Sequence, residues 1–301
     1  MDWLTFSQLP TPEIAQIVRA AGPKVAVFPI NGTRRWFMLE YPGEPDWDTY
    51  LTVIWRKHLE LYQLLFEHGL DTLVTPVYGP ELLTRGNDYL KLVERGLAWF
   101  AKNDSALDFY QRFDVRVRVY GDAAGYFTGT PYESILADYE AITQQTAHHQ
   151  SCRLFFGVCA HDASENVAAF GARYFQQYGK LPGRKEIITA YYGEYVEPAS
   201  FFIGFDRPTV FDMPLIATGE EDLYFTVNPS CYLEATGLRA ILYDHLYGRR
   251  VNEDYRQLSP ADWQWLKDFY TLNRYQILGV GQKVFEGAFW LPTSQLSFPN
   301  R

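Results

Sequence analysis

Cysteine is scarce in this sequence of 301 residues, which contains only Cys152, Cys159 and Cys231. The number is odd, and no two of the three form a CxxC pair. A disulfide framework and a cysteine-based zinc site are therefore both disfavoured. Because disulfides belong to oxidising compartments, we expect the protein to work in a reducing cytoplasm.

Positively charged residues are also few. The sequence has 27 Lys and Arg but 36 Asp and Glu, which gives a net charge of -9. Nucleic-acid binding depends on clustered Lys and Arg, so a nucleic-acid partner is not expected. No apolar run approaches the ~20 residues of a membrane span. The first residues also lack the basic and apolar regions of a signal peptide. A phosphorylated substrate would need a local basic site or a metal ion.

Several catalytic motifs are missing. The sequence has no GxGxxG after its first apolar run, no GxxxxGK[ST] and no GxSxG. Dinucleotide-binding, P-loop and α/β-hydrolase functions are therefore unsupported. The histidines lack metal-ligand spacing. The DDxxD and DxDD motifs of helical terpene synthases are absent as well.

Aromatic residues, in contrast, are abundant: 22 Tyr, 21 Phe and 8 Trp make up 17% of the chain. Such residues fill cores, and they also line pockets in which their π-faces stabilise a cation. Composition by itself favours the core, and it leaves the second use open.

Apolar, β-branched runs alternate with segments of helical periodicity along the chain. We expect strands at 25–30, 72–78, 115–120, 153–158, 201–205 and 223–227, and helices at about 48–69, 80–102, 131–148, 162–178, 184–195, 231–247 and 260–275. This alternation predicts an α/β fold with a central, mostly parallel sheet of about six strands and helices on both faces. Residues 1–301 are expected to form a single domain, with 1–22 as a short N-terminal arm.

The stretch 25–40, VAVFPINGTRRWFMLE, stands out. A β-branched run stops at Asn31-Gly32, and Arg34 and Arg35 follow at once. Ligands of α/β proteins bind beyond the carboxyl ends of strands, and paired guanidiniums suit phosphate-like anions. The pattern is also that of a turn with two solvated arginines, so both interpretations stand at this point.

The run FPINGTRRWF resembles the first signature of the cis-prenyltransferases, an Asp-Gly-Asn-Gly-Arg-Trp run that binds an allylic diphosphate. Asn31 takes the Asp position, Gly32 the first Gly, and Arg35-Trp36 the Arg-Trp. Later, IGFDRPTVFDMPL followed by DLYFT resembles the distal signature. On that match Arg207 and Thr209 correspond to Arg-x-Ser-x-Phe, and Asp222 to the Glu of Glu-Leu-Tyr-Phe.

A closer resemblance, spanning about Ile14 to Tyr247, is to the tuberculosinol/tuberculosinyl adenosine synthase group of bacterial diterpene synthases, which have the cis-prenyltransferase fold. The segments that carry it are IVRAAGPKVAVFPINGTRRWF, FEHGLDT, YYGEYVEPASFFIGF and LRAILYDHLY. The group includes enzymes that make kolavane-type alcohols. The resemblance implies a substrate already cyclised by a class II diterpene cyclase: a bicyclic C20 diphosphate, ionised here with Mg²⁺ as cofactor. It also implies a homodimer, for which Trp263, Trp265, Phe269 and Tyr270 are candidate interface residues.

The resemblance also implies roles for individual residues. Asn31, Tyr50 and Arg35 are the catalytic candidates. The expected diphosphate-binding residues are Gly32, Thr33, Arg34, Arg35, Arg207 and Thr209. Trp36, Phe37, Tyr78 and Tyr89 are expected to line the substrate pocket, and Asn31 and Asp222 to bind the metal. A cluster of Tyr191, Tyr192, Glu194 and Tyr195 is either a pocket wall or a dimer surface.

Asn31 departs from the family pattern, because an amide offers Mg²⁺ only a carbonyl dipole where aspartate offers a full charge. A unit charge ~4 Å away at an effective dielectric of ~20 contributes about 4 kcal/mol. Asn31 is either an Asp-to-Asn substitution that impairs the enzyme, which we favour, or a natural residue in a protein that works without this charge. In the first case Asn31→Asp would raise Mg²⁺-dependent turnover at least tenfold.

Four functions remain after this reasoning. The first is a terpene synthase, a diphosphate lyase or hydrolase in type, that quenches the allylic cation with water and releases a diterpene alcohol. The second is transfer of the same cation to a nucleoside such as adenosine. The third is cis-prenyl chain elongation, which the incomplete distal signature disfavours. The fourth is a non-enzymatic isoprenoid-binding subunit.

Overall fold

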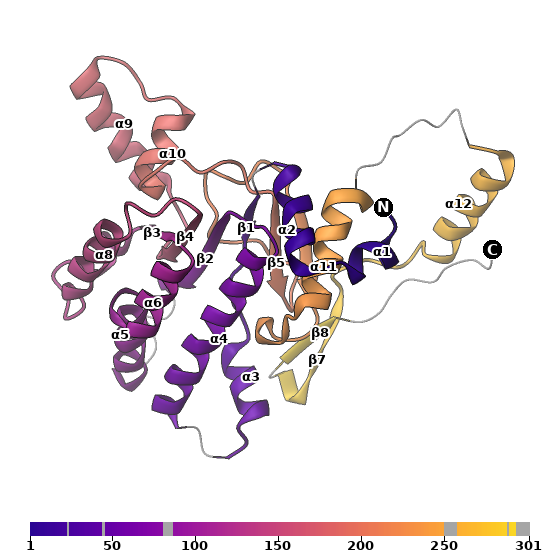
Figure 1. Cartoon of the computed structure of the whole chain (residues 1–301), viewed down its shortest axis with the longest axis horizontal. Coiled ribbons are helices and arrows are strands. Elements are labelled where there is room, and N and C mark those ends of the chain that lie inside the picture. The colour runs from indigo at the N-terminus through magenta and orange to yellow at the C-terminus, as the bar shows by residue number, and fades with distance from the viewer. Residues whose placement is uncertain (23, 44–45, 81–86, 250–257, 288, 293–301) are drawn as a thin grey trace.

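The computed structural model describes residues 1–22, 24–43, 46–80, 87–249, 258–287 and 289–292, with only the backbone described for 87–94 and 287 (Figure 1). Six strands form its main sheet: β1 (Val25–Val27), β2 (Thr72–Tyr78), β3 (Val115–Tyr120), β4 (Cys152–Val158), β5 (Phe201–Phe205) and β6 (Asp222–Thr226). Their order is β3-β4-β2-β1-β5-β6, and every neighbouring pair is parallel. The predicted parallel sheet is confirmed. Strand β1 is shorter than the strand expected at 25–30.

The helices that the structure describes surround this sheet. They are α1 (Trp3–Gln8), α2 (Thr11–Ala20), α3 (Thr33–Glu40), α4 (Trp47–Glu67), α5 (Asn87–Lys102), α6 (Asp104–Arg112), α7 (Ala123–Phe127), α8 (Ser134–Gln145), α9 (Ser164–Tyr178), α10 (Arg184–Tyr192), α11 (Ala235–Tyr243) and α12 (Pro260–Leu272). A π-helical turn, Asp244–Gly248, continues α11. The expected N-terminal arm is part of the body, because Phe6, Ile14 and Val18 are completely buried.

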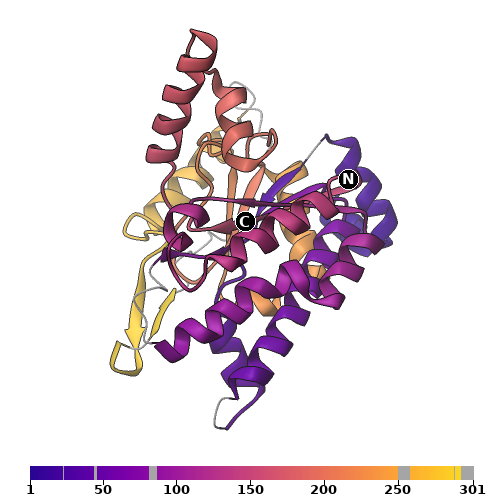
Figure 2. The ribbon, with the colours of Figure 1, turned by 90° about the vertical axis from the view of Figure 1, so that its left-hand side faces the viewer.

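Two hydrophobic cores lie on opposite faces of the sheet. The larger one is built by side chains of α2, α4, α5, α6, α8 and α11. The smaller one is covered by α10, through Ile188 and Tyr192, and by a loop that contributes Met213 and Ile216. Both faces carry helix, as predicted, but the second is covered largely by irregular chain. α9 contributes no buried residue and projects from the body (Figure 2).

The tyrosine and glutamate cluster supports this second face. The Tyr192 hydroxyl donates a hydrogen bond to the carbonyl of Pro214 at 2.7 Å. Glu194 forms ion pairs with Arg116 at 2.8 Å and Arg118 at 3.1 Å. The alternating arginines of β3 therefore anchor the segment after α10. The cluster belongs to the covering layer of the sheet, and none of its residues lines the cavity described below.

The C-terminal region holds an element that periodicity did not reveal, a hairpin of β7 (Gly281–Val284) and β8 (Phe289–Pro292). α12 stands away from the body in Figure 1 and has no buried residue. Trp263 is 44% exposed and Tyr270 62% exposed. Their exposure is compatible with an interface between copies, and the homodimer stays a prediction.

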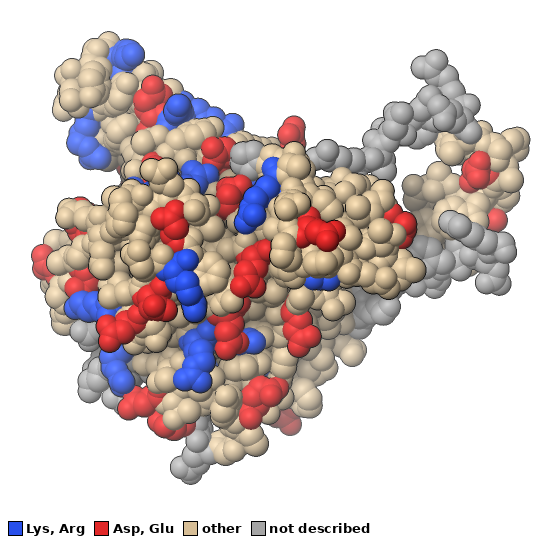
Figure 3. Space-filling model, viewed as in Figure 1, with Lys and Arg blue, Asp and Glu red and all other residues tan. Residues whose placement is uncertain are grey.

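Charges of both signs are mixed over the face shown in Figure 3, without a broad basic patch. No helix within the described ranges combines the length and apolarity needed to cross a membrane.

Candidate functional site

The site begins where β1 ends. After Val27 the chain passes through Asn31 to Gly32, which adopts a left-handed conformation (φ 74°) and caps α3. A Cβ at position 32 would lie 2.5 Å from the Phe205 ring, so only glycine fits between the two loops. The turn therefore places the N-terminus of α3, with Arg34 and Arg35, at the carboxyl edge of the sheet.

A cavity of about 1300 Å³ opens at this edge. Its walls come from the β1–α3 turn, α4, the end of β2, α5, the loops after β4 and β5, and the β7–β8 hairpin. The residues that line it are Ile30, Asn31, Gly32, Thr33, Arg34, Arg35, Met38, Leu39, Trp47, Tyr50, Leu51, Ile54, Trp55, His58, Pro76, Val77, Tyr78, Gly79, Gly96, Leu97, His161, Phe211, Asp212, Phe285, Phe289 and Leu291. One end is polar and cationic, and the other is formed by apolar and aromatic side chains.

The polar end suits an anion. The first N–H groups of an α-helix have no partner inside the helix, and its N-terminus carries partial positive charge. In α3 the first backbone hydrogen bond within the helix is donated by Trp36 to Gly32. Arg34 and Arg35 lie on the same turn and both face the cavity. A phosphate group at this place meets helix N–H donors and guanidiniums together.

Arg35 is held on three sides. Its guanidinium forms an ion pair with Asp206 at 3.2 Å. It also lies over the rings of Phe205, 5.0 Å away, and Phe289, 4.3 Å away. These contacts orient the side chain before any ligand arrives, and Phe289 ties the C-terminal hairpin to the polar end of the cavity.

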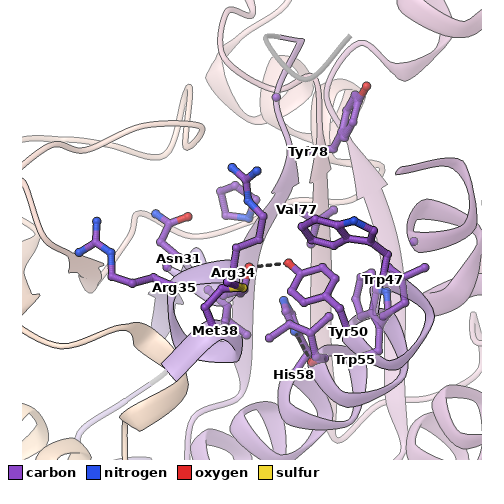
Figure 4. Close-up of a pocket in the computed structure, with 18 of the residues that line it drawn as sticks. Asn31, Arg34, Arg35, Met38, Trp47, Tyr50, Trp55, His58, Val77 and Tyr78 are labelled. Carbon is purple, nitrogen blue, oxygen red and sulfur yellow. Dashed lines mark hydrogen bonds between the residues drawn. The ribbon is translucent and has the colours of Figure 1, made fainter. Parts of the chain in front are cut away.

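A pair of hydroxyl groups lies where the polar and the apolar parts of the cavity meet. The Tyr50 and Thr33 hydroxyl oxygens are 2.9 Å apart, which joins α4 to the first residue of α3 (Figure 4). The Tyr50 ring has Phe37 and Trp47 at its edges, with ring centroids 5.3 and 5.7 Å away. The tyrosine hydroxyl is thus fixed at the junction between the cationic and the apolar parts of the cavity.

α3 decides which side chains of the RRWF run reach the cavity. Arg34, Arg35, Met38 and Leu39 face it, as the 3.6-residue period allows. Trp36 and Phe37 point to the opposite side, where they are 9% and 3% exposed in the main core. Trp36 and Phe37, which were expected to line the substrate pocket, are therefore not among the residues that line this cavity, and Phe37 instead packs behind it against the Tyr50 ring. Trp47, Tyr50, Trp55 and Tyr78 supply aromatic surface instead.

Sequence reasoning missed His58. Tyr50, Ile54 and His58 recur one helical turn apart along α4, and all three line the cavity. The His58 Nδ1 lies 2.7 Å from the Ile54 carbonyl oxygen. A carbonyl only accepts, so Nδ1 carries the hydrogen and Nε2 keeps its lone pair. Burial lowers the pKa of His58 from 6.5 to about 4, because the apolar wall penalises the imidazolium.

We expect His58 to make stability depend on pH. Its unfolded state binds a proton below pH 6.5, whereas the folded state resists until about pH 4. Unfolding free energy should therefore fall as pH drops from 7 to 4, by up to about 3 kcal/mol from this group. His58→Phe should flatten the slope in denaturant titrations, while His68, whose pKa burial also lowers, retains part of it. Substitution of the exposed His148 serves as control, and an unchanged slope in His58→Phe would contradict the expectation.

Comparison with known proteins was made on the whole chain. No family model matches it. A tuberculosinyl adenosine transferase of Mycobacterium tuberculosis is 41% identical over 279 residues, covering 92% of this chain and 94% of that protein. This chain belongs to the tuberculosinyl adenosine transferase family. A second relative, the (+)-kolavelool synthase of Herpetosiphon aurantiacus, is 28% identical over 298 residues, covering 95% of this chain and 97% of that protein.

Solved structures agree on the fold. A lavandulyl diphosphate synthase from Lavandula x intermedia, in complex with dimethylallyl diphosphate, matches with a TM-score of 0.61 at 13% identity over 75% of this chain and 96% of that one. A probable undecaprenyl diphosphate synthase from Campylobacter jejuni matches with a TM-score of 0.54, also at 13% identity, over 77% and 98% of the two chains. The cis-prenyltransferase fold expected from the two signatures is confirmed, and the named relatives of this family are enzymes that process diterpenyl substrates.

The distal signature of the family lies elsewhere than its match suggested. Arg207 and Thr209 follow β5, are exposed and do not line the cavity. Asp222 starts β6, at the amino edge of the parallel sheet and so at the opposite end from Asn31. There its carboxylate accepts from His245 Nδ1 at 2.7 Å and lies 3.5 Å from Arg249. Asp222 is therefore remote from Asn31, whereas Arg207 and Thr209 lie at the same carboxyl edge as Asn31 without being among the residues that line the cavity.

The remaining expected residues divide as follows. Asn31, Gly32, Thr33, Tyr50 and Tyr78 are brought together on the cavity wall. The Tyr89 side chain lies outside the described residues. Sequence reasoning also missed Asp206 and the β7–β8 hairpin, because both reach Arg35 through tertiary contacts.

Proposed function

We propose that this protein ionises a bicyclic C20 diterpenyl diphosphate, of kolavenyl or tuberculosinyl type, and that water quenches the allylic cation to give a diterpene alcohol and diphosphate. The observation that carries the proposal is the cavity itself. A helix N-terminus and two arginines form one end, an aromatic and aliphatic chamber forms the other, and a fixed tyrosine hydroxyl lies between them. Family membership supports the diterpenyl substrate class.

Each part has a task in such a reaction. When the C–O bond breaks, negative charge grows on the departing diphosphate, and Arg34, Arg35 and the N–H groups of α3 stabilise it. Positive charge grows on the allylic carbon, which the faces of Trp47, Tyr50 and Trp55 shelter. A buried C20 skeleton removes ~400 Å² of apolar surface from water, a gross gain of about 10 kcal/mol before ordering costs.

A divalent ion fits this arrangement only if the protein and the substrate diphosphate bind it together. Among the described residues, no group of three or more His, Cys, Asp or Glu side chains is placed to hold a metal. Mg²⁺ commonly binds through one or two carboxylates and substrate phosphates, so a full protein cage is not needed. When bound, Mg²⁺ neutralises charge on the diphosphate oxygens. Asn31 offers one oxygen ligand at the site.

The nucleophile is placed by Tyr50 and Thr33. Their paired hydroxyls offer donors and acceptors within one hydrogen-bond length, so a water bound there is held at the boundary of the apolar chamber. The same pair relays the proton that water loses on attack, and the departing diphosphate accepts it. A class II diterpene cyclase would supply the bicyclic substrate, because the reaction proposed here starts from loss of diphosphate and not from protonation of an open chain.

The cavity volume favours a second candidate, transfer of the cation to a nucleoside such as adenosine. At about 1300 Å³ it exceeds the ~300–1,000 Å³ of most ligand sites, which leaves room beside a C20 diphosphate. The identity to a tuberculosinyl adenosine transferase supports the same reading. Chain elongation is less favoured, because Arg207 and Thr209 do not face the cavity.

One product analysis separates these functions. We expect purified protein with Mg²⁺ to convert tuberculosinyl or kolavenyl diphosphate to an alcohol, detected by mass spectrometry, with ¹⁸O from labelled water in the hydroxyl. Adenosine added at millimolar concentration should leave this product dominant. A nucleoside adduct would establish the second candidate, and elongation would require isopentenyl diphosphate to appear in a longer chain. Failure to release diphosphate from any C20 substrate would refute the proposal and leave an isoprenoid-binding subunit.

A further inference from the structure

Two strand ends meet beside Arg35. β1 and β5 are neighbours in the sheet, with Val27 opposite Phe202. Asn31 follows Val27 by four residues, and Asp206 follows Phe202 by four residues, so the register brings the two loops to the same level. The close approach of Gly32 to the Phe205 ring confirms that these loops are in direct contact.

Both loops are anchored to the end of β6. The Asn31 backbone N–H donates to the Ser230 Oγ at 3.1 Å, and the Ser230 N–H donates back to the Asn31 carbonyl at 3.1 Å. The Asp206 N–H donates to the Thr226 carbonyl at 3.1 Å. Ser230 is completely buried. The positions of Asn31 and Asp206 are therefore set by the sheet and not by loop motion.

The two oxygens of the Asp206 carboxylate differ in their hydrogen bonding. Its Oδ2 accepts from Arg35, at 3.2 Å. Its Oδ1 is buried and has no hydrogen-bond partner in the described part of the chain. A buried carboxylate oxygen without a partner is costly, and such an atom calls for an ion or a donor that completes it. Asn31 and Arg35 extend to the same side of the first turn of α3, where that ion would lie (Figure 4).

A divalent cation on a diphosphate is held by at least one carboxylate in most protein sites. Asn31 is neutral, so it cannot provide that charge. We propose that Asp206 provides it: the Asp206 Oδ1 and the Asn31 amide oxygen form a divalent-cation site between the carboxyl ends of β1 and β5, against a diphosphate bound by α3. Asp206 also positions Arg35 through its other oxygen.

This inference rests on the proposed function for its diphosphate, and it changes the expectation for Asn31. The site keeps one carboxylate, carried by the neighbouring strand, so an amide at position 31 does not by itself mark an impaired enzyme. Asn31→Asp should then raise turnover less than threefold, in place of the tenfold gain expected if the charge were missing.

The test uses Mn²⁺ as metal and inorganic diphosphate as anion, with binding followed by electron paramagnetic resonance. Mn²⁺ takes the same oxygen ligands as Mg²⁺. We expect Asp206→Asn to weaken Mn²⁺ binding in the presence of diphosphate at least tenfold. In that background Asn31→Asp should restore affinity to within threefold of wild type, whereas in wild type it should change affinity less than threefold.

Two further variants guard against a folding defect. Asp206 has a left-handed backbone (φ 69°) that glycine adopts freely, so Asp206→Gly should fold well and still lose the metal. Asp138→Asn is the matched control, because Asp138 is an ion-paired aspartate of similar burial, 16% exposed against 18% for Asp206, and lies on α8 away from the cavity. Thermal unfolding of each variant establishes that it is folded.

Wild-type affinity in both Asp206→Asn and Asp206→Gly would overturn the assignment. Loss of Mn²⁺ binding in Asp222→Asn together with wild-type binding in Asp206→Asn would also overturn it, because Asp222 of the distal signature would then be the carboxylate that binds the metal. These titrations need no turnover. A protein that binds Mn²⁺ as expected but releases no diphosphate from C20 substrates would therefore refute the proposed function and leave the metal site standing.

Discussion

Replacement of Arg34 by alanine should lower kcat/KM for a C20 diterpenyl diphosphate by about 10²–10³, equivalent to about 3–4 kcal/mol of transition-state stabilisation. Arg34 extends from the first turn of α3 into the cavity and is an exposed side chain there. Arg35 is already paired with Asp206 and lies between two rings, so it has less freedom to follow the departing diphosphate. Arg34 is thus the residue that we expect to meet the developing negative charge.

The measurement is diphosphate release under kcat/KM conditions, coupled to a colorimetric phosphate assay. Arg173→Ala is the matched control, because Arg173 is an exposed arginine on α9, which projects from the body and does not line the cavity. It should change kcat/KM less than threefold. A loss of less than tenfold in Arg34→Ala would show that the α3 arginines do not bind the leaving group.

Tyr50→Phe should lower kcat at least 10²-fold with little change in KM, because the ring stays and only the hydroxyl is lost. That hydroxyl lies 2.9 Å from the Thr33 hydroxyl at the junction of the polar and apolar parts of the cavity. Without it, water at the cation loses its orienting partner and the hydroxyl that relays its proton to the diphosphate. We expect the residual product to shift from the alcohol toward hydrocarbons formed by proton loss from the cation.

Gas chromatography with mass spectrometry measures this ratio directly. Tyr41→Phe is the control, since Tyr41 is an exposed tyrosine at the end of α3 that stacks on Phe37 without lining the cavity. Thr33→Val should reproduce part of the defect, because it breaks the same hydroxyl pair. A Tyr50→Phe enzyme with normal turnover and an unchanged product ratio would remove Tyr50 from the chemistry.

Both predictions rest on residues that sequence reasoning had already singled out, and the reason is local. The β1–α3 turn is built from consecutive residues, so the Gly32 cap and the two arginines stay together whatever surrounds them. Tyr50 lies only 17 residues further on, at the start of an amphipathic helix that must pack on the same edge. Short-range geometry of this kind is visible in a linear pattern.

Sequence reasoning could not tell which face of a helix or which edge of the sheet some residues occupy. Trp36 and Phe37 belong to the same motif as Arg35, yet the helical period turns them into the core. Asp222 lies at the start of a parallel strand, and a strand start is at the opposite edge of the sheet from Asn31. Motif matching places such residues next to each other in a signature but does not tell which face or which end they occupy.

The amino-acid sequence by itself determined the strand and helix alternation, the parallel α/β class and the anion-binding turn after β1, because apolar periodicity and turn chemistry are properties of neighbours along the chain. Tertiary structure alone decided that His58 lines the cavity, that Phe289 covers Arg35, and that Asp206 forms an ion pair with Arg35. These contacts join residues up to about 250 positions apart, and only strand order and register determine them. Asn31, a departure when read within its motif, follows a strand whose neighbour in the sheet, β5, is followed by the carboxylate of Asp206.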